Sequence, residues 1–219
     1  MNKIALQQPL LIMLYGFPGA GKTYFARQLA DTIQIAHLQA DRLRHELFEE
    51  PRFDAQENNL VNHLMDYMAE EFLKAGVSVI YDTNAMRQAQ RRHLRELARN
   101  SKANHLLIWL QIDRESSFTR TQSRDRRKSD DKYALAFDSR SFEEYLKQMQ
   151  NPKNEDYVVI SGKHNFSTQK SAVIKRLYEK NMIDAQSAIS RSVKPGLVNL
   201  IPAPSAGRVD ISRRNIVIR

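Results

Sequence analysis

The sequence predicts an α/β fold in three layers, with a mainly parallel, five-stranded sheet covered by helices on both faces. Along most of the 219 residues, short apolar runs alternate with segments of helical periodicity. This alternation is typical of right-handed strand–helix–strand crossovers, which build parallel sheets. A loop with three glycines, Gly16, Gly19 and Gly21, separates the first apolar run from the first helical segment, so a strand can turn sharply into a helix there.

The individual elements follow from periodicity. We predict strands at apolar runs bounded by turn-forming or polar residues, at positions 10–15, 35–41, 77–82, 105–113 and 156–162. We predict helices where apolar residues recur every three or four positions, at 24–33, 58–76, 87–100 and 169–181. In the longest of these, Leu60, Leu64, Met68 and Phe72 recur every four residues, and Gly76 suits the helix C-terminus.

Composition and charge limit the class of protein. The chain is 42% hydrophobic and 27% charged, as in globular proteins, and it has no cysteine, which excludes disulfides. No apolar run is long enough to span a bilayer, so we expect a cytoplasmic protein. We predict one domain over residues 1–184 and a basic extension over residues 185–219, which contains the turn-forming sequences KPG and PAPSAG. The net charge of +9 favours an anionic partner.

The glycine loop has the sequence of a phosphate-binding loop. GFPGAGKT matches the pattern G-x-x-x-x-G-K-[ST] at every position and lies between a predicted strand and a predicted helix. Its backbone N–H groups can point at an anion, and the helix N-terminus adds a favourable dipole. Lys22 can reach the β- and γ-phosphates, while the Thr23 hydroxyl can bind Mg²⁺. We therefore expect the loop to bind ATP with Mg²⁺ through Gly16, Phe17, Pro18, Gly19, Ala20, Gly21, Lys22 and Thr23.

Other features favour a kinase over a GTPase or a motor ATPase. The sequence has no guanine-reading N-K-x-D motif, and the strand VSVIYD ends in the single acid Asp82, where a motor usually has an acidic pair. A kinase with this loop needs a carboxylate for the acceptor hydroxyl, an acid near the metal, and arginines over the phosphates.

Two acids that end predicted strands are candidates for these tasks. Asp41 lies at the carboxyl edge of the sheet, where sites form in parallel sheets, and could orient and deprotonate the acceptor hydroxyl. Arg44 follows one helical turn later and could bind an anionic acceptor. Asp41 could also cap a helix. Asp82 could hold Mg²⁺ through water, or form a strand-end turn with Asn84.

The segment RTQSRDRRKSDDK predicts an arginine-bearing lid at about residues 120–136. Arg120 and Arg124 share a helix face if the helix after Asp113 extends to them. The planar guanidinium group of arginine suits phosphate oxygens, so we expect both residues to bind phosphates and Arg124 to act in catalysis. The alternative is a solvated basic loop.

These segments together resemble a known family. With GFPGAGKT, ADRLRHELF, YDTNAMRQAQRRHL and RTQSR in this order, residues 8–180 resemble the P-loop kinases related to bacteriophage polynucleotide kinase. That branch also contains zeta-toxin-like sugar-nucleotide kinases and antibiotic phosphotransferases. The resemblance implies that Asp41 is the general base and Arg44 an acceptor-binding arginine, and it places Asp82 and Asn84 at the acceptor site. Residues 185–219 depart from the family pattern.

Three functions remain open from the sequence. The first, which we favour narrowly, is ATP-dependent phosphorylation of a polynucleotide 5′-hydroxyl, with Arg91, Arg95 and Arg99 as a basic helix face. The second is a kinase for a sugar, nucleoside or antibiotic, over which the segments 57–75 and 137–150 would close. The third is an ATP-binding regulatory protein that transfers no phosphoryl group.

Overall fold

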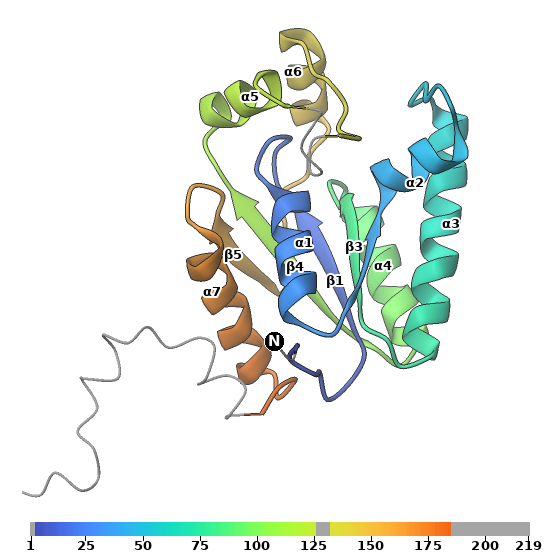
Figure 1. Cartoon of the computed structure of the whole chain (residues 1–219), viewed down its shortest axis with the longest axis vertical. Helices are drawn as coiled ribbons and strands as arrows, with labels where there is room; N and C mark the ends of the chain where they lie inside the picture. Colours follow the sequence, from blue (N-terminus) through green and yellow to red (C-terminus); the bar gives the residue numbers. More distant parts are fainter. Residues whose placement is uncertain (1–2, 126–131, 185–219) are drawn as a thin grey trace, which may run out of the picture.

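The computed structural model describes residues 3–125 and 132–184. A five-stranded, all-parallel sheet of order β2-β3-β1-β4-β5 runs through the centre, with helices on both faces (Figure 1). The strands are β1 (Leu10–Tyr15), β2 (Ala36–Gln39), β3 (Val79–Asn84), β4 (Asn104–Gln111) and β5 (Tyr157–Ser161). The helices are α1 (Lys22–Thr32), α2 (Ala40–Leu47), α3 (Ala55–Lys74), α4 (Gln88–Asn100), α5 (Arg114–Gln122), α6 (Ser139–Lys147) and α7 (Phe166–Glu179).

All five predicted strands and the four predicted helices are confirmed, with shifts at their ends. β2 ends at Gln39, so Asp41 lies in the first turn of α2 rather than in the strand as predicted. The helix α6 was not predicted because it is short; the Asp138 side chain caps its N-terminus by accepting a hydrogen bond from the Ser141 N–H group.

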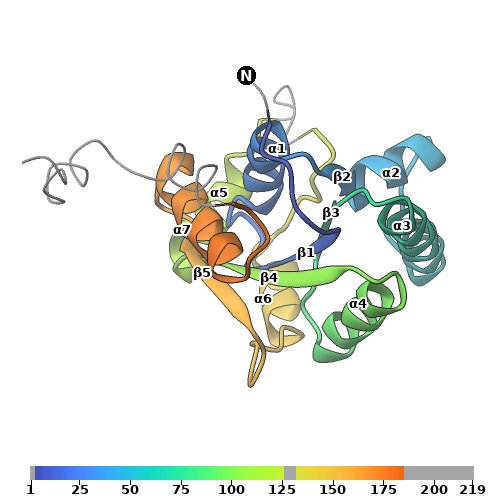
Figure 2. The same ribbon diagram turned by 90° about the horizontal axis from the view of Figure 1, so that it is seen from below.

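The sheet separates two apolar cores, and β1 contributes to both. Leu10, Ile12 and Leu14 face the core with α1 and α7, while Leu11 and Met13 face the core with α3 and α4. Figure 2, viewed from below, shows these helix pairs on opposite faces of the sheet. Every residue of β1 is buried, as expected for a central parallel strand that reads as one continuous apolar run. The residues after β1 are therefore held by a rigid strand.

The basic face predicted on α4 is not formed, because two of its arginines turn inward. Arg91 is fully buried and donates to the Glu155 carboxylate, with Nε 3.0 Å from both oxygens, and to two backbone carbonyl oxygens. Arg95 donates to the same carboxylate. Arg99, in contrast, is exposed. The prediction of a nucleic-acid-binding row of Arg91, Arg95 and Arg99 was wrong, since Glu155 approaches from a distant part of the chain.

Two further sequence-based predictions concern the limits of the domain. The predicted extension, residues 185–219, lies outside the described residues, so its boundary stays a prediction. Within the ranges that are described, none of the helices combines the length and the apolar character that crossing a bilayer requires.

The Arg91–Glu155 contact generates a stability prediction. Glu155→Ala leaves a buried guanidinium without its carboxylate, so we expect the free energy of unfolding to fall by about 3–5 kcal/mol in urea denaturation followed by circular dichroism. The matched control is Glu144→Ala, which removes the exposed Arg140–Glu144 pair on α6 and should change stability little. Equal small effects of the two substitutions would show that Arg91 does not depend on Glu155.

Candidate active site

The phosphate-binding loop leaves the carboxyl end of β1 and enters α1 at Lys22. Gly19 and Gly21 have φ angles of 82° and 90°, in the left-handed region that glycine tolerates best. A Cβ atom at Gly19 would also collide with the backbone oxygen of Ser117 in α5. The Ser117 hydroxyl donates a hydrogen bond to the Pro18 carbonyl oxygen, so α5 is attached to the loop. The loop backbone is therefore fixed where its N–H groups can surround an anion.

Lys22 lies across the loop. Its Nζ atom donates to the carbonyl oxygens of Gly16 and Phe17, each at 2.9 Å. Burial lowers the pKa of Lys22 to about 8; Asp82 and Asp41 act in the opposite direction, and Arg124 lowers the pKa further. The ammonium group is thus positioned at the centre of the predicted phosphate site.

Thr23 and Asp82 lie next to each other at the ends of α1 and β3. The Thr23 Oγ1 atom donates to Asp82 Oδ1 at 3.4 Å, and His37 Nε2 lies 2.9 Å from Asp82 Oδ2. This hydroxyl and this carboxylate could hold Mg²⁺, which usually takes one or two protein carboxylates together with phosphate oxygens and water. No cluster of three or more His, Cys, Asp or Glu side chains suited to a metal ion occurs in residues 3–125 and 132–184. His37 was not among the predicted site residues.

Asp41 lies in the first turn of α2. It does not cap this helix, because the N-cap residue is Gln39. Burial and the negative charge of Asp82 raise the pKa of Asp41, whereas Arg44, Arg124 and Lys22 lower it. Lys22 and Asp82 are therefore close enough to Asp41 to affect its pKa. A carboxylate that faces the terminal phosphate would need to lie near both of these groups.

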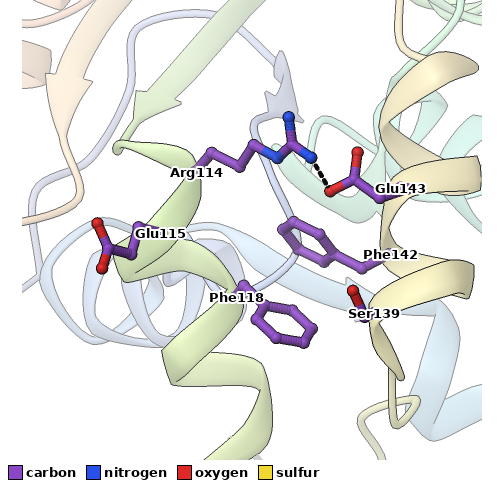
Figure 3. Close-up of a pocket in the computed structure, with 6 residues that line it drawn as sticks. All are labelled: Arg114, Glu115, Phe118, Ser139, Phe142 and Glu143. Carbon is purple, nitrogen blue, oxygen red and sulfur yellow. Dashed lines mark ion pairs between the residues drawn. The ribbon is translucent and has the colours of Figure 1, made fainter.

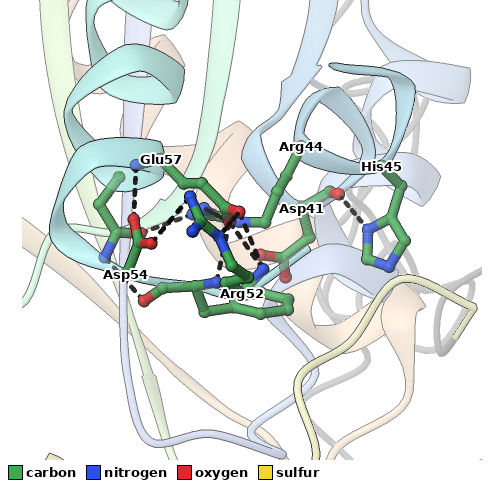
Figure 4. Close-up of polar contacts among 8 residues, drawn as sticks. Asp41, Arg44, His45, Arg52, Asp54 and Glu57 are labelled. Carbon is green, nitrogen blue, oxygen red and sulfur yellow. Dashed lines mark hydrogen bonds and ion pairs between the residues drawn. The ribbon is translucent and has the colours of Figure 1, made fainter. Parts of the chain in front are cut away.

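Arg44 is occupied by a buried ion pair. Its side chain is 5% exposed, with Nη1 3.2 Å from Glu57 Oε2 and Nη2 2.6 Å from Asn58 Oδ1, and it lies over the Phe53 ring (Figure 4). Glu57 also accepts hydrogen bonds from the backbone N–H groups of Arg52 and Phe53. Although burial alone would raise the pKa of Glu57, these donors hold it below its ordinary value. Glu57 was not among the predicted site residues. It lies 13 residues after Arg44 in the sequence, and the loop before α3 brings the two side chains together.

The two predicted lid arginines do not share a helix face. The helix α5 ends at Gln122, so the condition under which Arg120 and Arg124 would share a helix face is not met. Arg120 Nη1 donates to the Gly162 carbonyl oxygen at 2.9 Å, and Arg124 donates to the Leu135 carbonyl oxygen. Residues 126–131 of the predicted lid lie outside the described part of the chain, so the lid stays a prediction.

Asn84 connects the loop with α6. Its Oδ1 atom accepts from the Gly16 N–H group at 3.3 Å, and its Nδ2 atom donates to the Tyr145 hydroxyl oxygen at 2.9 Å. Asn84 thus lies beside the loop, and its predicted role at the acceptor site stays a prediction. Tyr145 was not among the predicted site residues. It belongs to the segment 137–150 that we expected to close over a small acceptor.

A separate cavity of about 260 Å³ lies between α5 and α6 (Figure 3). Arg114 of α5 and Glu143 of α6 form an ion pair there, and the rings of Phe118 and Phe142 line it. None of the predicted site residues lines this cavity.

Comparison with known proteins finds solved structures that share this fold. Similar solved structures include a sugar kinase from Janibacter sp. HTCC2649 (TM-score 0.55, 16% identity, 83% of this chain and 98% of that chain). Another is the Mycobacterium tuberculosis APS kinase CysC in complex with AMPPNP and APS (TM-score 0.57, 19% identity, 78% and 98%). A third is Chaetomium thermophilum Kti12 in complex with ADP-AlF3 (TM-score 0.59, 15% identity, 81% and 100%).

At these identities the likeness extends to the fold alone. A search of curated protein sequences gave no match. The sequence profile of the AAA_33 family, described as an AAA domain, matches residues 11–152, which include the phosphate-binding loop, Asp41, Asp82 and Asn84. Because this match spans more than half of the chain, the protein belongs to the AAA_33 family of P-loop NTPases.

Proposed function

We propose that this protein is an ATP-dependent kinase that transfers the γ-phosphate of ATP to a hydroxyl group of a small acceptor molecule. The observation that carries the proposal is the grouping of Asp41 with Lys22 and Asp82, in which each residue affects the pKa of Asp41. A nucleotide-binding site alone needs the lysine and the metal-binding acid. A second, partly buried carboxylate is suited to accept the proton of an acceptor hydroxyl.

In this reaction each group has one task. The loop N–H groups and Lys22 bind the β- and γ-phosphates and neutralise charge on the phosphoryl group. Thr23 and Asp82 would hold Mg²⁺, which supplies further charge neutralisation on the phosphate oxygens. Asp41 orients the acceptor hydroxyl and takes its proton. We propose that Arg120 and Arg124 cover the phosphates.

The acceptor is better explained by a small molecule than by a polynucleotide. A polynucleotide needs free cationic side chains for its phosphates. Arg91 and Arg95 share the Glu155 carboxylate, and Arg44 is bound to Glu57, so these three arginines already have partners within the protein. The sugar kinase and the APS kinase among the similar structures act on small acceptors, which supports the proposal by analogy of fold only.

A polynucleotide 5′-hydroxyl stays the second candidate acceptor. Arg87, Arg92 and Arg99 are exposed on or beside α4, and they leave a smaller basic surface than the sequence suggested.

A transfer assay distinguishes the candidates. Radiolabelled ATP and Mg²⁺ are supplied with neutral hexoses and pentoses, nucleosides, aminoglycoside antibiotics, and 5′-hydroxyl DNA and RNA oligonucleotides. We expect label in a small molecule. Label in oligonucleotides alone would replace this proposal with the second candidate. ATP binding in calorimetry without transfer to any acceptor would favour an ATP-binding regulatory protein.

The loop assignment predicts the effect of removing the lysine charge. Lys22→Ala should weaken ATP binding in calorimetry and lower the transfer rate by roughly 10²-fold or more, because a cation on the phosphates is lost. Lys175→Ala is the matched control, since Lys175 is exposed on α7, and it should behave as the unaltered protein. Unchanged transfer in Lys22→Ala would refute the assignment.

The role of Asp41 predicts a different pattern. Asp41→Asn should leave the dissociation constant for ATP unchanged and lower kcat by roughly 10²-fold or more, the usual scale of general base catalysis. Asp31→Asn changes an exposed acid on α1 and serves as the control. A parallel loss of ATP binding would instead make Asp41 a structural residue.

The two shifted pKa values predict a bell-shaped pH profile. The acidic limb should reflect Asp41, whose activity as a base is lost as the pH falls through its raised pKa. The basic limb of kcat/KM for ATP should lie at about pH 8, because Lys22 loses its charge there. Lys22→Arg should move the basic limb to higher pH, since arginine stays charged. A basic limb unaffected by Lys22→Arg would contradict its assignment.

A further inference from the structure

The hydrogen bonds of Asn84 determine which way its amide points. The Gly16 backbone N–H group can only donate, so the Asn84 atom that faces it at 3.3 Å must be the oxygen Oδ1. The opposite atom, Nδ2, then faces the Tyr145 hydroxyl oxygen at 2.9 Å. The orientation of this amide is therefore imposed by the first residue of the phosphate-binding loop.

The amide orientation fixes the role of the Tyr145 hydroxyl group. An amide NH₂ group can only donate, so the Tyr145 oxygen accepts the hydrogen bond from Asn84 and its own hydrogen is directed elsewhere. Within residues 3–125 and 132–184, the Tyr145 hydroxyl has no hydrogen-bond acceptor. Tyr145 as a whole residue is only partly buried.

Tyr145 lies at the side of the site where Asp41 would receive an acceptor. Burial raises the pKa of Tyr145, and the negative charge of Asp41 raises it further, whereas the hydrogen bond from Asn84 lowers it. The phenol therefore stays protonated near neutral pH and can donate. Its ring packs edge-on against Phe137, with centroids 5.4 Å apart, which restricts its orientation. Asn84 and Phe137 together hold the hydroxyl in one place beside the loop.

The surrounding charges indicate the kind of molecule that would bind there. Arg44, which follows Asp41 by three residues, is paired with Glu57 and is 5% exposed, while Arg42 forms an exposed pair with Glu46. The acceptor side thus presents a carboxylate, a neutral phenol and a neutralised arginine. The Asp41 carboxylate would repel an anionic acceptor, and both arginines of α2 already have carboxylate partners. A neutral molecule with several hydroxyl groups would instead meet hydrogen-bonding groups.

We propose that Tyr145 contacts the acceptor by donating its phenolic hydrogen to an oxygen atom of a neutral, polyhydroxylated molecule, and so determines acceptor specificity. This inference rests on the proposed kinase function, because that function defines the acceptor. Tyr145 transfers no proton to the reacting phosphoryl group; it fixes the position of the acceptor molecule while Asp41 receives the proton of the reacting hydroxyl.

The test compares Tyr145→Phe with the unaltered protein. The probe is whichever neutral hexose, pentose or nucleoside the unaltered protein phosphorylates. We expect the KM for this probe to rise roughly 3- to 10-fold, the usual effect of losing one neutral hydrogen bond, with the KM for ATP and the melting temperature unchanged. Tyr178→Phe, which removes a hydroxyl from an exposed tyrosine on α7, is the matched control and should change neither constant.

Monodeoxy analogues of the probe then identify the contact. The analogue that lacks the contacted hydroxyl should have a higher KM than the probe with the unaltered protein. With Tyr145→Phe, the KM of this analogue should rise no further, because the hydrogen bond to Tyr145 is already absent. A Tyr145→Phe variant with an unchanged probe KM would overturn the specificity role and leave the kinase function intact. Coupled losses of ATP affinity and thermal stability would assign Tyr145 a structural role instead.

Two results with the unaltered protein also overturn the inference. Phosphorylation of oligonucleotides alone would show that the acceptor is not a neutral, polyhydroxylated molecule, while kinase activity itself would stand. Transfer to no probe at all would remove the proposed function together with this inference.

Discussion

Close packing around the phosphate-binding loop is the constraint on which the rest of the site depends. A Cβ atom at Gly19 would collide with the Ser117 backbone oxygen, and one at Gly162 would lie 2.8 Å from the Ala20 oxygen. The loop is thus in close contact with α5 and with the residues after β5, and no Cβ atom fits at Gly19. Because its backbone cannot shift, the directions of its N–H groups, and of Lys22 and Thr23, are fixed before any nucleotide binds.

Pairing of buried charges explains why several arginines of the sequence do not contribute to a basic surface. Arg44 and Arg91 are buried, and each is neutralised by a glutamate, Glu57 and Glu155 respectively. Removing a charge from water is costly unless it is paired, so these arginines serve the fold. At the loop, burial lowers the pKa of Lys22, and burial also raises the pKa of Asp41. Such shifts are typical of functional sites.

The sequence predicted the features that depend on neighbouring residues and missed those that depend on distant ones. The strands and the loop were predicted because apolar periodicity and the glycine pattern are local. The partners of Arg91 and Asn84 were missed, since Glu155 and Tyr145 are 64 and 61 residues away from them. The end of α5 at Gln122 was also missed, because polar residues continue past it without a clear helix stop signal.

Gly16 is held from two sides, and this links the two halves of the proposed reaction. Its carbonyl oxygen accepts from Lys22, which would bind the phosphates, and its N–H group donates to Asn84, which positions Tyr145 on the acceptor side. Phosphoryl transfer requires the terminal phosphate and the acceptor hydroxyl to be placed within a fraction of an ångström of each other. Attaching the groups for both substrates to one residue at the end of a buried strand would favour this placement. A protein that only bound ATP would have no need for the second half of this arrangement.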